Sequence, residues 1–132
     1  MTVNFVPDGT VAQDVYDDRT LEWLSTPALT GCESLTAIRI ELPAGGGHTF
    51  HRHPEQEEFL YVIEGSVELW VEVESRTLGV GDACFVPRNV VHASFNDSPN
   101  RVLMLAILGP SVGETGATIV EVGHEEPWAS LR

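Results

Sequence analysis

Apolar and polar side chains alternate along several stretches of this chain. In residues 67–74 the odd positions are valine or leucine and the even ones are mostly glutamate, which predicts a strand with one core face and one wet face. Residues 59–63 are apolar on both faces, so we expect a strand that is buried on both sides. A long apolar strand is predicted at residues 102–108.

Turn residues separate these runs. A strand that begins near Ser34 ends at Pro43 and the glycine run that follows, and residues 96–100 form a turn cluster. Gly81 precedes a strand at 83–86, and Pro87 begins the turn before another at 92–95. A strand at 117–122 is possible, whereas residues 20–24 are too few to assign. Many short strands with little helical periodicity predict an all-β barrel or sandwich.

The chain has the size of one domain. Its 132 residues can form a single core, and no internal repeat is visible. We divide it into an N-terminal arm at 1–33, a barrel core at 34–110, and a C-terminal strand and acidic tail at 111–132. The arm is expected to cover the barrel or to reach a partner subunit.

The charge of the chain excludes several functions. The formal net charge is −13 and all seven basic residues are arginine. Nucleic acids and anionic membranes need basic patches, so we expect neither as a partner. Without lysine there is no amine for Schiff-base chemistry. Acids in excess with no lysine are typical of proteins from salt-loving organisms, and a GC-rich genome explains the same composition equally well.

Two features predict a cytoplasmic protein. No stretch approaches the ~20 apolar residues that span a bilayer, and the first four residues lack the basic-then-apolar layout of a signal peptide. Cys32 and Cys84 match no metal-binding spacing, which fits free thiols in a reducing compartment. Cys84 could border a pocket, although a buried and inert thiol is the more common case.

Three histidines and a glutamate form the strongest chemical signal. His51 and His53 share one face of a strand because they are two residues apart. Glu58 follows a turn-like segment, and His92 comes from a distant hairpin. Each histidine alone has an ordinary reading as a surface or core residue. Together, imidazole and carboxylate groups are ligands of first-row transition metals, so these four residues predict a metal site inside a small β-barrel.

The other two histidines are not assigned to this site. His48 has the wrong strand parity to join His51 and His53, and we expect it in a loop near the mouth of the barrel. His124 lies in the acidic tail and is expected to be solvated.

Fixed spacings surround the four predicted ligands. The first stretch reads G-x5-H-x-H-x4-E-x6-G from Gly45 to Gly65, and the second reads G-x5-P-x-N-x2-H-x3-N from Gly81 to Asn96. These stretches resemble the two consensus motifs of the cupin superfamily. The family has glycine where this chain has Asn89, and asparagine tolerates a left-handed turn better than most residues.

The resemblance covers a core from about Ser34 to Leu108. It implies a single-domain jelly-roll (cupin) β-barrel with one divalent transition metal, which could be Fe, Mn, Ni, Zn or Cu. It also implies the ligand set, which is His51, His53, Glu58 and His92.

The reaction is less constrained than the site, because cupins perform many functions. Four protein ligands on an octahedral ion leave two positions for water, substrate or dioxygen. The leading hypothesis is a dioxygenase-type enzyme for a small enol, diketone or aromatic substrate, with Glu58 as a metal ligand or a general base. The alternatives are a metal-assisted isomerase or cyclase, and a non-catalytic cupin that binds a metal or small ligand.

Strand parity also predicts the pocket and a partner. The pocket wall should include Leu60, Val62, Ser94 and apolar residues of 102–108, a mostly apolar lining that suits an aromatic or carbonyl substrate. The opposite face, with Phe59, Tyr61 and Ile63, is too apolar to leave in water. We therefore expect a homodimer, or an N-terminal arm that covers this face.

Overall fold

The computed structural model describes all 132 residues, and its regular elements are almost all strands. None of its helices is long or apolar enough to cross a membrane. The elements are β1 (Gln13–Val15), β2 (Thr20–Ser25), α1 (Pro27–Thr30), β3 (Thr36–Leu42), β4 (Gly47–Arg52), β5 (Glu57–Glu64), β6 (Val67–Val71), β7 (Glu74–Leu78), β8 (Ala83–Val86), β9 (His92–Phe95), β10 (Val102–Gly109), β11 (Val120–Glu121) and the 3-10 turn η1 (Trp128–Ser130).

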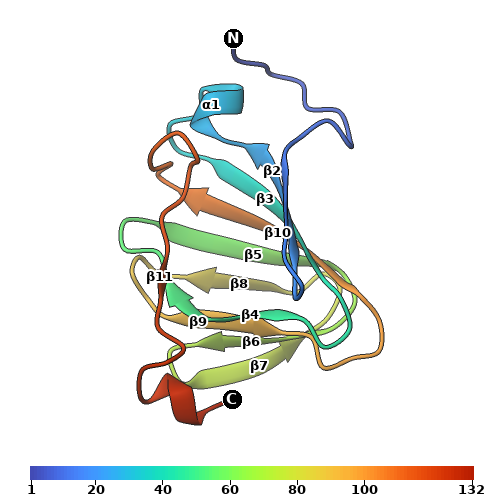
Figure 1. The fold of residues 1–132 in the computed structure, drawn as a ribbon, viewed down its shortest axis with the longest axis vertical. Coiled ribbons are helices and arrows are strands. Elements are labelled where there is room, and N and C mark those ends of the chain that lie inside the picture. Colours follow the sequence, from blue (N-terminus) through green and yellow to red (C-terminus); the bar gives the residue numbers. More distant parts are fainter.

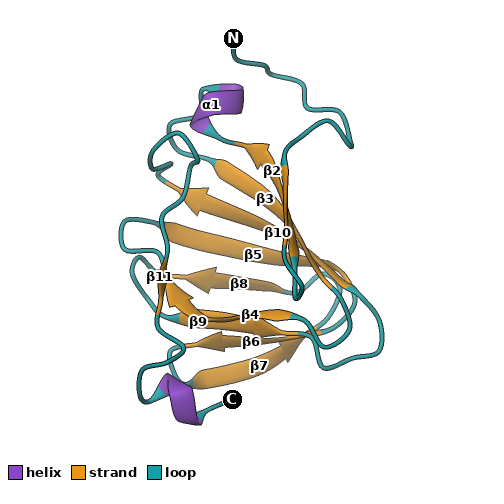
Figure 2. Cartoon of the chain, in the orientation of Figure 1, coloured by secondary structure: helices purple, strands orange, loops and turns teal.

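The strands form two antiparallel sheets (Figure 1). One has the order β1-β2-β3-β10-β5-β8 and the other the order β11-β4-β9-β6-β7. Figure 2 shows how little helix there is, since only α1 and η1 interrupt the strands and loops. The predicted all-β jelly roll is therefore confirmed.

The main core lies between the two sheets. Strand β10 alternates buried and half-buried side chains along its whole length, and Val62, Met104 and Val102 are fully buried. In β5 the inward residues are buried, but outward Phe59, with 43% of its surface exposed, is not. The prediction that residues 59–63 are buried on both sides is wrong, because no element of the chain covers the outer face of this sheet.

The outer face of the other sheet is covered by the C-terminal segment. A second cluster of buried residues there includes Phe50 and Val91, and Trp128 and Leu131 pack against it. The indole Nε1 of Trp128 also donates to the carbonyl of Glu72 at 3.3 Å. The acidic tail is therefore attached to the barrel by its apolar residues.

Residues 13–25 form a hairpin that extends the six-stranded sheet. Strand β2 pairs with β3 and β1 pairs with β2, although residues 20–24 were too few to assign from sequence. The turn at residues 16–19 closes with Tyr16 N donating to Arg19 O at 2.8 Å, and Gly47 N donates to Asp18 O at 3.0 Å. A side chain at Gly46 would collide with that Asp18 carbonyl, so the glycine run lets the hairpin turn reach β4.

Two asparagines of the second motif shape turns. Asn89 has φ 64°, the left-handed conformation that glycine would adopt without strain, so the departure from the consensus is accommodated. Asn96 is fully buried, and its Nδ2 donates to the carbonyls of Leu42, Pro43 and Asn100. This asparagine therefore ties the end of β3 to the turn at residues 96–100 at one end of the barrel.

Candidate metal centre

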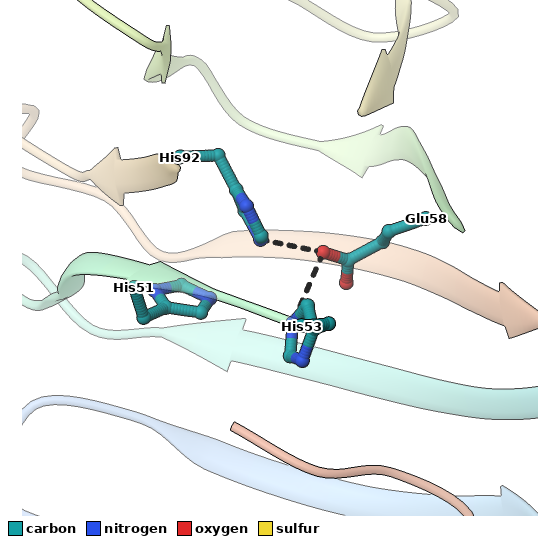
Figure 3. A group of neighbouring side chains, drawn as sticks. All are labelled: His51, His53, Glu58 and His92. Carbon is teal, nitrogen blue, oxygen red and sulfur yellow. Dashed lines mark ion pairs between the residues drawn. The ribbon is translucent and has the colours of Figure 1, made fainter. Parts of the chain in front are cut away.

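The four residues predicted to share a site do lie together. His51 is on β4, His53 follows the last residue of that strand, Glu58 is near the start of β5 and His92 begins β9. His51 and His92 are direct partners in the β4–β9 ladder. Glu58 reaches them from the opposite sheet (Figure 3). One ligand atom from each residue can be chosen so that all four lie within 4.8 Å of one another, and all four residues are buried.

Backbone carbonyls orient all three imidazoles in the same way. The Nδ1 atoms of His51, His53 and His92 lie 2.6, 2.7 and 3.0 Å from the carbonyl oxygens of Thr49, Thr118 and Val90. A carbonyl only accepts, so each Nδ1 carries the proton and each Nε2 is left with a lone pair. Such carbonyl partners commonly fix the tautomer of histidines that bind metals.

Two buried atoms at the centre of the site have no hydrogen-bond partner. Glu58 Oε1 and His92 Nε2 are 2.7 Å apart, yet neither makes a hydrogen bond of acceptable geometry. With the Nδ1 of His92 protonated, both facing atoms are electron-pair donors, and burying them together is costly. A divalent cation bound by both atoms would remove this cost. The donor set of three imidazoles and one carboxylate also fits such an ion.

The protonation states agree with this picture. Burial, with the neighbouring His92 and His48, holds the pKa of His51 well below its ordinary value, so the ring is neutral at pH 7. Burial alone would raise the pKa of Glu58, but the facing imidazoles of His92 and His53 outweigh this effect and hold the pKa well below the usual range. Burial would lower the pKa of His53, but Glu58 raises it instead.

A cavity of about 350 Å³ opens from the four residues. This size is within the range of small-molecule sites. Leu60, Ser94 and Leu108 line it as predicted, whereas Val62 does not. The remaining wall is largely apolar, and its side chains come from both sheets, from the β1–β2 turn and from the segment before β11. They are Leu21, Trp23, Ile38, Ile40, Leu69, Ala93, Ala117 and Ile119, with the polar Asp14, Tyr16, Arg19, His48, Thr115 and Glu121.

The family model described as the cupin domain matches residues 38–108, more than half of the chain. The chain belongs to the cupin family. Its matches to curated relatives are partial. It is 30% identical over 94 residues to germin-like protein 8-14 of Oryza sativa, covering 66% of this chain and 44% of that one. The tetracenomycin polyketide synthase protein TcmJ of Streptomyces glaucescens is 38% identical over 82 residues, covering 61% and 55%.

This cupin thus spans about half the length of the curated relatives that it matches. A solved structure of similar size is that of KdgF from Halomonas sp., with a TM-score of 0.71 and 23% identity, covering 83% of this chain and 96% of that one. At this identity the likeness supports the fold alone.

His48 lies in the cavity wall of this cupin, and the expectation of a loop position is wrong. It is the second residue of β4, and its ring stacks on that of His51 with centroids 3.7 Å apart. A register shift between His48 and His51 in the β4–β9 ladder reverses the simple alternation of faces. Its Nε2 is 2.9 Å from Glu121 Oε1, so the structure adds an acid and a base that sequence reasoning missed.

Gln56 is a second residue that sequence reasoning missed, because it was read as part of a turn. It is buried, and its Nε2 donates to the carbonyls of Pro110 and Gly116 at 2.9 and 2.8 Å. Its Oε1 accepts from Thr118 N at 3.2 Å. The carbonyl of that same Thr118 accepts from His53, so Gln56 holds the segment that orients one imidazole.

Three further residues have simpler outcomes. His124 is exposed, as expected for a solvated tail residue. Cys32 and Cys84 are free thiols. Cys84 is half-buried against the main core and does not line the metal cavity, and burial, with a smaller contribution from Glu58, raises the pKa of its thiol.

Proposed function

We propose that this cupin is a metal-dependent enzyme that acts on a small enolisable or aromatic carbonyl compound, with dioxygenase-type chemistry as the leading reaction. The observation that carries the proposal is the convergence of three preoriented Nε2 atoms and one ionised carboxylate at the cavity. The likeness to TcmJ, a protein named for a polyketide synthase, supports a carbonyl-rich substrate.

His51, His53, Glu58 and His92 would hold the ion. When bound, a redox-active transition-metal ion would supply Lewis acidity and a position at which dioxygen can react. In a dioxygenase reaction both atoms of one O2 enter the products while a carbon–carbon bond of the enol breaks, so no further reductant is needed. The apolar walls of the cavity exclude water and orient the rest of the substrate.

Metal content and oxygen uptake test this proposal together. Protein loaded with Fe, Mn, Ni, Cu or Zn would be supplied with a panel of diketones and phenols while dissolved oxygen is recorded. We expect oxygen consumption with at least one redox-active metal and none with Zn. A protein that binds metal but leaves the whole panel unchanged under every metal would instead favour a non-catalytic binding cupin.

The second candidate is a metal-assisted isomerase or cyclase that needs no oxygen. The pair formed by His48 and Glu121 favours it, because this pair lies in the cavity wall and could exchange a proton with a bound substrate. The hydrogen bond from His48, partly opposed by burial, lowers the pKa of Glu121, and burial lowers that of His48. This reaction would proceed anaerobically with Zn, which separates it from an oxygenase.

Glu58 can act as a ligand or as a base, and Glu58→Gln separates the two roles. A ligand role predicts weaker metal binding, because an amide oxygen is a poorer ligand than a carboxylate. A base role predicts that metal content is retained while turnover falls by about 10²–10⁴-fold. Metal content is measured first by elemental analysis, and turnover is then compared per bound metal ion.

The outer face of the six-stranded sheet supports a homodimer. Phe59, Tyr61, Ile63 and Phe85 are exposed there, and the hairpin β1–β2 leaves them open because it pairs at the far edge, beyond β3. A twofold axis would bury the same face on both copies. Sedimentation should show a dimer for the wild type and a monomer for Tyr61→Glu. Val73→Glu, a change at an exposed residue of the β6–β7 turn, should leave the dimer intact.

A further inference from the structure

Arg19 is the only arginine in the wall of the metal cavity. It ends the turn between β1 and β2, and only 16% of its side chain is exposed. Its guanidinium carbon lies 4.3 Å from the centre of the Tyr16 ring, which holds the plane of the group. Because the turn is tied to β4 through Gly47 and Asp18, the position of Arg19 is fixed relative to the site.

Most of the donors of Arg19 have no acceptor. One Nη atom donates to Asp18 Oδ1 at 2.8 Å, and this is the one hydrogen bond of the guanidinium. The Nε atom is buried and has no partner. A guanidinium presents five N–H groups in a rigid fork, and a buried N–H without an acceptor is costly. The group therefore has unused donors, although its charge is already paired with Asp18.

The acids of the cavity wall do not accept from these donors. Asp14 accepts from the indole of Trp23 at 2.9 Å, and Glu121 is paired with His48. Glu58 faces His92 and His53 at the metal centre. Moreover, the whole chain carries a net charge of −13, so its field repels anions, and an anionic ligand needs a local cation to enter. Apart from the ion that the metal centre would hold, Arg19 is the one arginine or lysine that this cavity offers.

We propose that Arg19 binds a carboxylate of the substrate, and that the enzyme selects small enolisable carboxylic acids, such as diketo acids, over neutral diketones. The substrate carboxylate would accept from the Nη donors of Arg19 that Asp18 does not use, with the charge-assisted geometry typical of arginine. Its enol end would then face the His51, His53, Glu58 and His92 group across the apolar part of the cavity. This inference rests on the proposed function, because it names the substrate class for the same site.

Calorimetric titration with a matched pair of probes tests the proposal. The probes are 4-phenyl-2,4-dioxobutanoate and its methyl ester, which replaces the charged carboxylate by a neutral group one methyl larger. Zn-loaded protein is titrated without oxygen, so that no oxygenation accompanies binding, and recovery of both probes unchanged after the titration is checked. We expect the wild type to bind the acid about ten- to a hundredfold more tightly than the ester, the range for a charged hydrogen-bonded group.

Three arginine variants test whether Arg19 causes the preference for the acid. Arg19→Gln should abolish the acid-over-ester preference while leaving the affinity for the ester within about twofold. Arg19→Lys, which keeps the charge but not the fork, should retain part of the preference. Arg76→Gln removes the same charge from an exposed position on β7 and should leave the preference intact. No preference in the wild type, no binding of either probe, or a preference that survives in Arg19→Gln would overturn the proposal.

Titration of metal-free protein separates this inference from the proposed function. If the metal increases the affinity for both probes equally and the protein shows no preference for the acid, the Arg19 proposal fails and the metal-dependent function stands. If Arg19 sets the acid preference but the metal changes neither affinity, the carboxylate site stands and direct contact between metal and substrate fails. If Arg19→Gln does not fold, the test still rests on Arg19→Lys and on the ratio of the wild-type affinities for the acid and the ester.

Discussion

The metal centre and the mouth of the cavity are built by different means. At the metal centre, neighbouring strands bring His51 and His92 together as ladder partners, and backbone carbonyls fix each imidazole. At the mouth, the polar groups come from segments far apart in the chain. Arg19 lies on the first hairpin, His48 on β4 and Glu121 on β11. The first region is specified by local spacing and the second by docking of chain segments onto the barrel.

Because they are built differently, the two regions determine different properties of the protein. A preoriented ligand set determines which ions bind and how tightly, and it tolerates little movement. The mouth determines which molecules enter, and its charged groups can change without altering the ligand geometry. Variants that damage one region and spare the other therefore test whether the two are independent.

The largest effect is expected from removing the ligands. The triple variant His51→Ala, His53→Ala, His92→Ala should retain no stoichiometric metal by elemental analysis, because three of the four donors are gone. Each single change should weaken binding sharply. The matched control is His124→Ala, an exposed histidine outside the cavity. Full metal content in the triple variant would show that the ion is held elsewhere.

Gln56→Leu should produce the next largest effect. The substitution keeps the size of the side chain but removes its bonds to Pro110, Gly116 and Thr118, so the carbonyl that orients His53 is released. Loss of such a supporting contact typically costs about 10–100-fold in metal affinity. Competition with a chromophoric chelator measures it. If affinity is unchanged, the loop that carries Thr118 is held by other contacts.

The contrast between the two regions also explains what could be predicted from sequence. His51, His53, Glu58 and His92 were found because strand periodicity and short motif spacings are local properties of the chain. Arg19 and Glu121 were not found, because a hairpin and a two-residue strand must first dock before these side chains face the cavity.

Two errors have causes that a local pattern cannot show. His48 was placed in a loop because a register shift in the β4–β9 ladder leaves no signal in the alternation of apolar residues. The pattern around Phe59 predicts burial because an apolar strand face has the same sequence pattern whether the chain itself or a partner covers it. Strand pattern thus predicted the barrel and the four residues that converge in it, and long-range contacts decided the rest.

The stability of the metal-free protein should depend on pH mainly through the metal centre. Because the folded pKa of His51 is lowered below 6.5, the unfolded chain binds more protons in acid, and stability should fall as pH falls below about 6.5. His53 has a raised pKa and acts oppositely, so its contribution is complete below about 6.5 and is lost as pH rises through its folded value. Stability should therefore be greatest near pH 6.5.

Urea denaturation of EDTA-treated protein between pH 5 and pH 8 measures this profile. One proton taken up on unfolding gives a slope of about 1.4 kcal/mol per pH unit. His51→Gln should flatten the acid side and His53→Gln the alkaline side. An acid limb that stays equally steep in His51→Gln would mean that other groups, and not this buried imidazole, cause the loss of stability.

Salt should have the smallest effect, and it should act on the surface and the mouth while sparing the metal centre. A net charge of −13 crowds carboxylates on a small domain, and raising KCl from about 0.01 M to 1 M shortens the Debye length from about 30 Å to 3 Å. A gain on the order of 1 kcal/mol would raise the melting temperature by roughly 4 °C.

Salt also strengthens apolar burial, so charge reversal is the control. Glu68 is unsuited to charge reversal, because its carboxylate accepts from Trp70 and pairs with Arg132. Suitable positions are exposed acids without an ion pair, namely Glu55, Glu57 and Glu114. Changing these three to lysine should flatten the salt dependence and leave metal content intact. A wild-type melting temperature that stays level or falls over this range would leave genome composition as the explanation for the missing lysines.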